Sequence, residues 1–488
     1  MREWITTPIL AVLLGGCSLA PKYSRPEAPV ANTFVDGDGD SSDVVEVSWR
    51  DVLVNETLRQ VVETALENNR DLRVAALNVE AARARYRIER ADLAPQVDGS
   101  ASATRTKTSR ETFRGSGATF NEFDVGLGAS YELDLFGSVK NLKRQAWESY
   151  AALTETQRAA QIALVAEVAA QYLTLEEYRA QRKLARDTLD SLEATYNLTQ
   201  LRATVGVAAE DDLASVNVQT QTAEVQARSY DLLVVQTQNS LQTLVGAPLP
   251  ALPESEGKGI DDRLLADLPS GLPSDLIARR PDVLAAEHAL IAANANIGVA
   301  RAAFFPRISL TGDAGFASQD LQNLFTPGAT TWSFGPKLSV PIFAGGRNRA
   351  NLKLAKIQKR IEVARYEQVV QTAFREVSDA LVARQSLVGQ LQARHALIAS
   401  QQQRFDLATS KYQAGIGSYL EVLTAQQGLF QAQSAVITAE FVELRNLVAL
   451  YEALGGGWSA EDVPVVTEDD AKKSRQKRHE RPGESPRG

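Results

Sequence analysis

The stretch Phe123-Asp-Val-Gly-Leu-Gly-Ala-Ser-Tyr-Glu-Leu-Asp-Leu135 alternates apolar and polar residues along its whole length. Alternation with a period of two places the apolar side chains on one face of a β-strand and the polar ones on the other. A tilted strand of about 9 to 11 residues crosses a bilayer, with its apolar face toward lipid and its polar face toward a lumen. The stretch therefore predicts a membrane-spanning strand; an ordinary soluble sheet with one wet face is the alternative.

Two later segments, residues 308–316 and 332–342, alternate in the same way. The links within each strand pair, residues 105–121 and 317–331, are polar and fairly long, as loops outside the cell are. Four strands cannot close a membrane barrel, because about eight is the smallest closed form and an open edge in lipid is prohibitive. The barrel must be shared between copies of the chain, as a dimer, trimer or tetramer.

The chain also repeats itself, which indicates a tandem duplication. Four blocks align in order, with offsets of 211, 207, 209 and 209: Arg90–Val97 with Arg301–Ile308, Val125–Leu133 with Trp332–Val340, Tyr196–Gly206 with Phe405–Gly415, and Leu244–Gly246 with Ala453–Gly455. Copy one spans residues 56–247 and copy two spans residues 273–456. A Pro/Gly/Asp-rich linker, 248–272, joins them, and the charged tail 457–488 is expected to be disordered.

Each copy has the same predicted order of elements: a helix, two strands, a long helix, a turn and another helix. No Pro or Gly interrupts residues 139–203, and such a helix would be about 100 Å long at 1.5 Å per residue. The predicted ranges after the first helix are strands within 95–136 and helices 139–203 and 209–246 in copy one, then strands within 306–343 and helices 347–413 and 418–454 in copy two.

The last predicted helix carries two apolar series at alternating spacings of three and four. One series begins at Leu420 and ends at Tyr451; the other runs from Val422 to Ala439 and is rich in Ala. At 100° per residue the two series lie on opposite sides of the helix. Two opposed seams favour a ring or sheet of helices, whereas an antiparallel coiled-coil hairpin explains only one of them.

An apolar run from Trp4 to Leu14 leads into the only cysteine, Cys17. The run is too short to span a bilayer and has the length of a signal-peptide core. Leu14-Gly-Gly-Cys17 resembles a bacterial lipobox, in which the cysteine is acylated and becomes the first residue of the mature chain. We expect residues 1–16 to be a signal peptide and 17–55 an extended segment with a lipid on Cys17. Ser18 favours the outer membrane, because Asp there would favour retention in the inner membrane.

The composition excludes several classes of protein. One cysteine among 488 residues can form neither an internal disulfide nor a Cys-based metal site. His288, His395 and His479 lie far apart, and the net charge of −8 gives no reason to expect nucleic acid. No Ser-His-Asp set or phosphate-binding glycine loop is present, so we expect neither an enzyme nor a cofactor. No further apolar run reaches 18 residues, so the sequence predicts no transmembrane helix.

Five motifs stand where the copies begin, turn and end: Cys17–Pro26, Arg279–Val283, Ala302–Pro306, Val340–Arg347 and Tyr412–Leu420. Together they resemble the outer-membrane factor (TolC-like) family, in particular its OprM/NodT-type efflux lipoproteins, over residues 17–458. The resemblance implies an α+β fold: a trimeric β-barrel with four strands per protomer, continuous with a long periplasmic α-helical barrel. It also implies the exit duct of a tripartite drug-efflux pump, with a periplasmic adaptor and an inner-membrane transporter, RND type expected, as partners.

The resemblance points to two places that carry function. The first is the pair of helix–turn–helix tips, which face the adaptor in this family. Arg202 and Gly206 mark the tip of copy one, and Lys411 and Gly415 mark the tip of copy two. Glycine lets each chain reverse through left-handed backbone angles, so a plain helix cap explains the glycines equally well.

The second place is a constriction at the periplasmic end, which the family closes with a leucine and, one turn later, an aspartate. Leu420 matches the leucine, but Thr424 occupies the acidic position. Glu421, or the acidic run Glu210, Asp211 and Asp212, would supply negative charge instead, and three-fold repetition would turn any of them into a ring that favours cations. Solvated carboxylates that stabilise a helix start are the alternative.

Two other functions compete with drug efflux. The same architecture would serve as the exit duct of a type I protein-secretion system. Alternatively, a coiled-coil lipoprotein without a channel would tether the envelope layers.

Overall fold

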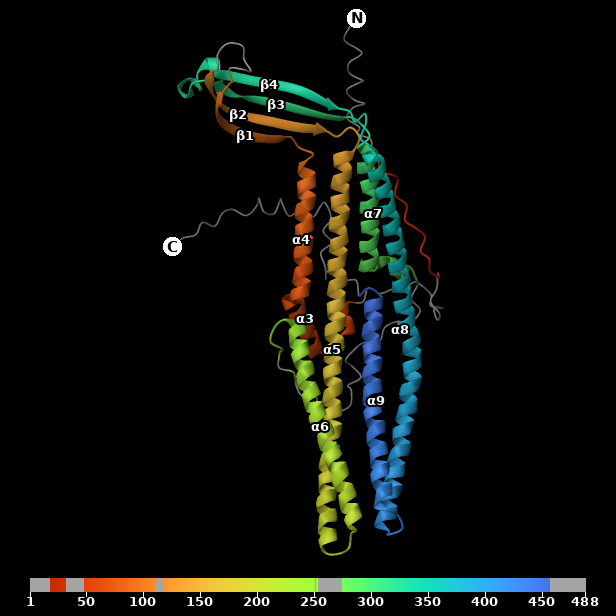
Figure 1. The fold of residues 1–488 in the computed structure, drawn as a ribbon. Helices are drawn as coiled ribbons and strands as arrows, with labels where there is room; N and C mark the ends of the chain where they lie inside the picture. The colour runs from red at the N-terminus through yellow and green to blue at the C-terminus, as the bar shows by residue number, and fades with distance from the viewer. Residues whose placement is uncertain (1–17, 32–47, 110–117, 251, 253–273, 457–488) are drawn as a thin grey trace. The chain divides into compact units, whose positions relative to one another are not determined.

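The computed structural model describes residues 18–31, 48–109, 118–250, 252 and 274–456 (Figure 1). Helices and strands alternate in the same order in both halves of the chain. In chain order the principal elements are α2 Trp49–Val52, α3 Glu56–Asn68, α4 Arg70–Ala91, β1 Gln96–Lys107, β2 Thr119–Leu133, α5 Ser138–Thr204, α6 Glu210–Val245, α7 Pro281–Ala302, β3 Arg307–Ser318, β4 Thr330–Ser339, α8 Arg347–Gln413 and α9 Tyr419–Ala453.

The chain divides into two compact units. Unit 1 contains the four strands and the helix segments next to them, within residues 1–29, 75–156 and 282–369. Unit 2 contains the remaining helix segments, within residues 30–74, 157–281 and 370–488. Both units therefore draw on both halves of the chain.

The four strands form one antiparallel sheet in the order β1-β2-β3-β4 (Figure 1). Strand β2, from the first half, pairs with β3 from the second, so the sheet joins the two copies. The register places Leu127, Ala314 and Trp332 side by side on one face, where Leu127 and Trp332 are exposed. Exposed apolar residues on one face of strands of 10 to 15 residues are what a lipid-facing sheet requires.

The opposite face of the sheet is polar. Ser102 Oγ donates to Asp124 Oδ2 on the next strand (3.3 Å), and Ser333 Oγ donates to Asp313 Oδ2 (3.0 Å). These cross-strand bonds orient the carboxylates on the face that is polar, as the interior of a membrane barrel is. The predicted alternation of an apolar and a polar face is confirmed.

Helices α5 and α8 contain 67 residues each. In unit 2, α5 binds α9 through a reciprocal pair, since Gln181 Nε2 donates to the Ser434 carbonyl (2.8 Å) and Ser434 Oγ donates to Gln181 Oε1 (2.9 Å). The main hydrophobic core of this unit gathers side chains from α2, α3, α5, α6, α8 and α9. Its largest fully buried members are Phe441, Leu58, Leu173, Leu175, Leu241, Leu450, Val52, Val61, Val62 and Val168.

The two apolar series of α9 have different surroundings. The Ala-rich series, which includes Ala425, Ala432 and Ala439, is buried within the single chain. The other series starts exposed at Leu420, whereas its members Leu423, Phe441, Val448 and Tyr451 are buried and Gln427 is exposed. One seam of α9 is thus filled by its own chain, and the other stays partly open along the first half of the helix.

Helix α7 is the one helix of the described chain that is long and apolar enough to cross a membrane by length and composition. Asp282, Glu287 and His288 interrupt its apolar residues, so it contains no unbroken apolar run of 18 residues. In unit 1 its side chains Leu290 and Ile297 are buried. Packing within the unit therefore accounts for its apolar character.

Candidate functional site

The turn between α5 and α6 is closed by backbone hydrogen bonds to the last turn of α5. The carbonyl of Arg202 accepts from Val207 N (2.8 Å) and Ala208 N (3.2 Å), while Gly206 takes a left-handed φ of 75°. A Cβ added at Gly206 would have no atom within 4 Å, so the left-handed backbone conformation alone favours glycine there. The side chain of Arg202 is exposed at this tip.

The turn between α8 and α9 repeats this geometry. The carbonyl of Lys411 accepts from Ile416 N (3.0 Å), and Gly415 has a φ of 73°. This turn also requires glycine at position 417, which the sequence analysis missed, because a Cβ there would lie 2.9 Å from Lys411 Cβ. The signal for it was the second glycine in Gly415-Ile416-Gly417, which has no counterpart in the first tip.

Both tips expose apolar side chains beside a cation. Val207 is 76% exposed and Ile416, its equivalent in the second copy, is 78% exposed. Arg202 and Lys411 stand five residues before them. Each tip therefore presents a small apolar patch flanked by a positive charge, which is a suitable contact surface for another protein.

The predicted constriction residues of α9 lie in its first turns. Leu420 is 66% exposed, and Thr424 Oγ1 donates to the Leu420 carbonyl (2.8 Å). Ser418 caps the helix by accepting from Glu421 N (3.3 Å). An exposed leucine at a helix start that its own chain does not cover is free to meet equivalent residues of other copies.

The acidic run begins α6, whose N-cap Ala209 offers no side-chain bond. Glu210 and Asp211 are exposed, whereas Asp212 is the one member whose charge acts on the first turn of α9. Burial, together with the smaller effects of the neighbouring Tyr412 and Asp212, raises the pKa of Tyr419 to about 12. The structure thus brings Asp212 toward α9 and leaves the other two acids in solvent.

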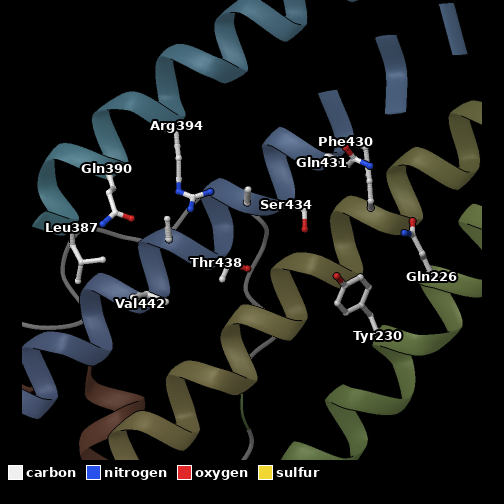
Figure 2. A pocket seen from close by; sticks show the side chains of 12 residues that line it. Gln226, Tyr230, Leu387, Gln390, Arg394, Phe430, Gln431, Ser434, Thr438 and Val442 are labelled. Carbon is white, nitrogen blue, oxygen red and sulfur yellow. The ribbon is translucent and has the colours of Figure 1, made fainter. Parts of the chain in front are cut away.

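A groove of about 420 Å³ follows the helices above these tips in unit 2. Figure 2 shows Arg394 and Gln390 reaching from α8 toward α9, with Gln226 and Tyr230 on α6 at the other side. An adjoining cavity shares Gln226 and Gln431 and adds further amides from α6 and α9: Gln219, Gln426 and Gln427. The lining combines amides with apolar side chains, and Arg394 is its charged member. The seven-residue spacing of Gln219 and Gln226 was the available signal for it.

In unit 1, residues 18–25 form a strap along α7. Asn294 Nδ2 donates to the Pro21 carbonyl (2.8 Å) and Arg301 Nη1 donates to the Leu19 carbonyl (2.9 Å). Gly298 leaves space that Asn141 of α5 and the strap occupy together, because a Cβ there would lie 2.5 Å from Asn141 Nδ2 and 2.9 Å from Ala20 Cβ. The sequence analysis predicted an extended segment here but none of these contacts.

The strap ends in an ion pair with Glu287. Arg25 Nε and the Tyr23 hydroxyl each donate to Glu287 Oε1 at 2.9 Å. Burial alone would raise the pKa of Glu287, but the bonds from Arg25 and Tyr23 outweigh it and hold the pKa below its ordinary value. A hydrogen bond with Glu148 (2.8 Å) raises the pKa of the adjacent His288.

At its other end the strap reaches the start of α5. Ser18 Oγ donates to Asn141 Oδ1 (3.0 Å), and Asn141 Nδ2 donates to the Gly137 carbonyl (2.6 Å), four residues after β2 ends. Cys17 itself lies outside the described residues, as do the predicted signal peptide, most of the linker and the charged tail. Within the described ranges, no three His, Cys, Asp or Glu side chains gather as a metal site requires.

Comparison with known proteins identifies the kind of molecule that carries these features. The family model "Outer membrane efflux protein" matches residues 61–247 and again residues 272–456. The chain belongs to the outer membrane efflux protein family. The two matches give the family's repeat twice, so the predicted tandem duplication is confirmed.

Relatives in this family match nearly the whole chain. The probable efflux pump outer membrane protein TtgC of Pseudomonas putida is 46% identical over 465 residues, covering 94% of this chain and 96% of TtgC. The cation efflux system protein CusC of Escherichia coli is 41% identical over 456 residues, covering 92% of this chain and 97% of CusC.

Solved structures of the family have the same fold. A crystal structure of CusC has a TM-score of 0.83 at 40% identity, covering 90% of this chain and 100% of that one. The open state of the Neisseria gonorrhoeae MtrE outer membrane channel has a TM-score of 0.82 at 36% identity, covering 90% and 98%. The predicted combination of long helices with a four-stranded barrel sheet is confirmed.

Family membership also decides between the functions left open by the sequence. The chain is an outer-membrane component of an efflux pump and a channel protein rather than an enzyme. Efflux, and neither protein secretion nor envelope tethering, is the function that these relatives support. The roles of the tips, the constriction and Cys17 stay predictions.

Proposed function

We propose that three copies of the chain form one conduit, with a 12-stranded barrel in the outer membrane and a helical barrel that extends into the periplasm. The observation that carries this proposal is the sheet: in the described chain β1 pairs only with β2 and β4 only with β3, so the outer side of each is an unpaired edge. An unpaired edge in lipid is prohibitive, and four strands are too few to close. Three copies of four strands give a closed, even-numbered barrel.

The conduit takes small organic molecules, such as drugs, from an inner-membrane transporter of RND type through a periplasmic adaptor. Two relatives are named for antibiotic and toluene efflux, at 46% identity each.

The test is assembly and conductance together. In mild detergent we expect particles of three times 53.0 kDa, and in planar bilayers we expect discrete, lasting channels. A monodisperse monomer with intact β signal would overturn the shared barrel. Trimers that never conduct would overturn the conduit.

The adaptor docks at the tips, in this proposal, through the apolar patches beside Arg202 and Lys411 and the turns at Gly206 and Gly415. Replacing Val207 and Ile416 together by Asp should abolish capture of the adaptor and leave trimer assembly unchanged. Equal capture by this variant would place the docking surface elsewhere.

The constriction, in this proposal, is Leu420 with the acids around it. Leu420→Ser should raise single-channel conductance, because a polar ring wets more easily than an apolar one. Thr424→Asp should strengthen cation preference, whereas neutralising Glu210, Asp211 and Asp212, or Glu421, should weaken it. Unchanged conductance and reversal potential in all these variants would move the constriction elsewhere.

The lipid anchor, in this proposal, is an acyl group on Cys17. The bond from Ser18 to Asn141 supports it, because the residue after Cys17 is held beside the start of α5, close to the end of β2. Cys17→Ser should abolish labelling with palmitate. The barrel should still insert in part, since twelve strands bury more apolar area than acyl chains do.

A further inference from the structure

Basic residues concentrate where the helices of unit 1 meet the strands. The first fifteen residues of α8, 347–361, contain six Lys or Arg and no Asp or Glu. The chain as a whole carries a net charge of −8, so the positive charge of this segment is opposite in sign to that of the whole chain. The end of α4 and the start of α5 add further cations beside the same sheet: Arg87, Arg90 and Lys140.

These cations share one end of the sheet. The antiparallel register pairs Gln96, which begins β1, with Ser130 near the end of β2, and pairs Arg307, which begins β3, with Ser339, which ends β4. The strand ends that connect to α4, α5 and α8 therefore lie along one edge. We call Arg87, Arg90, Lys140, Arg347, Arg349 and Lys353 the basic rim.

The side chains of the basic rim are exposed, and in the described chain none has a carboxylate within ion-pair distance. Arg349 and Lys353 are four residues apart on α8 and share a face. Like charges so placed repel one another and destabilise the helix unless an anion lies between them. An external anion bound at the rim would relieve this repulsion.

Apolar side chains stand directly next to the rim. Ile342 is 94% exposed and Phe343 is 91% exposed, in the link between β4 and α8. The lipid-facing residue Leu338 precedes them on β4, and Arg347 follows them. Apolar residues that reach into acyl chains, followed by cations at headgroup depth, are the arrangement of a membrane–water interface.

The depth of the rim fits a headgroup layer. From Arg347 to Lys353 a helix rises about 9 Å. The polar layer of a bilayer is about 5 to 8 Å thick on each side, and attraction to surface charge extends about 8 Å further at physiological salt. Every member of the rim can thus lie within reach of lipid phosphate.

We propose that the basic rim binds the phosphate groups of anionic phospholipids at the periplasmic surface of the outer membrane. The proposal rests on the outer-membrane location of the family and on the periplasmic position of the helices. It depends neither on an open channel nor on a lipid at Cys17. Each cation near an anionic surface contributes about 1 kcal/mol.

The test uses the full-length protein, delipidated in detergent. It is titrated with dioleoylphosphatidylglycerol, with dioleoylphosphatidylcholine and with inorganic phosphate, and bound lipid is measured by native mass spectrometry. The rim variant is Arg349→Gln with Lys353→Gln, because Gln keeps helix propensity and removes charge. The matched control is Arg375→Gln with Arg404→Gln, two exposed cations lower on the same helix.

We expect the native protein to prefer phosphatidylglycerol, and the rim variant to bind it about thirtyfold more weakly, as the loss of two charges implies. Binding of phosphatidylcholine, the control variant and single-channel conductance should not change. Equal affinity for the two lipids, or full preference retained by the rim variant, would overturn the proposal. Displacement of the lipid by inorganic phosphate would identify an ion site instead. Loss of the oligomer in the rim variant alone would identify a contact between copies.

Discussion

In each copy of the repeat, a side chain near the beginning of the copy donates a hydrogen bond to a backbone carbonyl at the end of its last helix. We call this bond the closure of the copy; the donor differs between the two copies. In the first, Asn69 Nδ2 donates to the carbonyl of Leu244 at the end of α6 (2.7 Å). In the second, Arg280 Nη1 donates to the carbonyl of Ala453 at the end of α9 (2.6 Å). Asn69 and Arg280 are equivalent at the offset of 211, and their acceptors are equivalent at 209. Duplication has kept the backbone acceptor and changed the donor.

The second closure is charged as well as buried. Arg280 also donates to Glu376 Oε2 (2.9 Å), whereas the first copy uses a neutral amide. Burial raises the pKa of the nearby Glu452, as does Glu376, and Arg280 opposes both. A main-chain carbonyl constrains geometry but not the type of donor, so the two copies could diverge in charge without losing the fold.

The first helices of the two copies differ in a similar way. Helices α4 and α7 each have 22 residues, but only α7 holds the N-terminal strap. Where α7 has Glu287, Asn294 and Gly298, α4 has Ala76, Arg83 and Arg87 at the same offset. A single strap can bind only one of two duplicated helices, and the other became free to carry exposed cations.

Among the variants that test this comparison, Arg280→Ala should lose the most unfolding free energy. It removes a charged donor from the Ala453 carbonyl and leaves a cavity, which together cost about 3 kcal/mol of unfolding free energy. Denaturant unfolding in detergent, followed by helix signal, measures the loss. Arg280→Lys keeps the charge and one donor and should lose about half as much. Equal stability of Arg280→Ala and the native protein would refute the closure.

Gly246→Ala should come second. Gly246 has a φ of 75°, and an added Cβ would lie 2.5 Å from the Asn68 carbonyl oxygen, so the backbone must move; we expect a loss of about 2 kcal/mol. Gly206 has the same φ with open space around it, which makes Gly206→Ala the control, at about 1 kcal/mol. A thermal or denaturant midpoint that falls equally in both variants would show that the Asn68 contact has no cost.

Asn69→Ala should cost about 1.5 kcal/mol, half the effect of Arg280→Ala. The variant loses the bond to Leu244 and also the N-cap bond from Leu72 N to Asn69 Oδ1 (2.8 Å). Asn69→Asp separates the two, because it keeps the cap and removes the amide donor. If Asn69→Asp is as stable as the native protein, the neutral closure contributes nothing.

The smallest effect should be the pH dependence of the strap, which has no counterpart on α4. The pKa of Glu287 is below its ordinary 4.5, so its pairing with Arg25 is fully present above pH 4.5 and is lost as the pH falls through that lowered pKa. A spin label at Lys22→Cys should gain mobility in that acidic range. In Glu287→Gln the label should be mobile at every pH. The raised pKa of His288 acts in the opposite sense, since its bond to Glu148 is lost as the pH rises above 6.5 through that pKa.

Much of the candidate site was predictable because it is local. A turn needs a left-handed residue between two helices, and Gly206 and Gly415 stand at such positions in the sequence. Exposure of Leu420 and capping by Ser418 also follow from their place at a helix start. The strap was not predictable, because its partners Arg25 and Glu287 are 262 residues apart. No period or spacing relates residues at that distance.

The sequence by itself determined the duplication, the amphipathic strands, the long uninterrupted helices and the need for several copies to close a barrel. These follow from periodicity and from breakers such as Pro and Gly, which act over a few residues. Only the tertiary structure decided which polar groups meet: Arg280 with Ala453, and Glu287 with Arg25. It also decided which seam of α9 its own chain fills and which cations at the sheet edge stay unpaired. Those outcomes depend on how distant segments pack, because a buried polar group must find its partner in three dimensions.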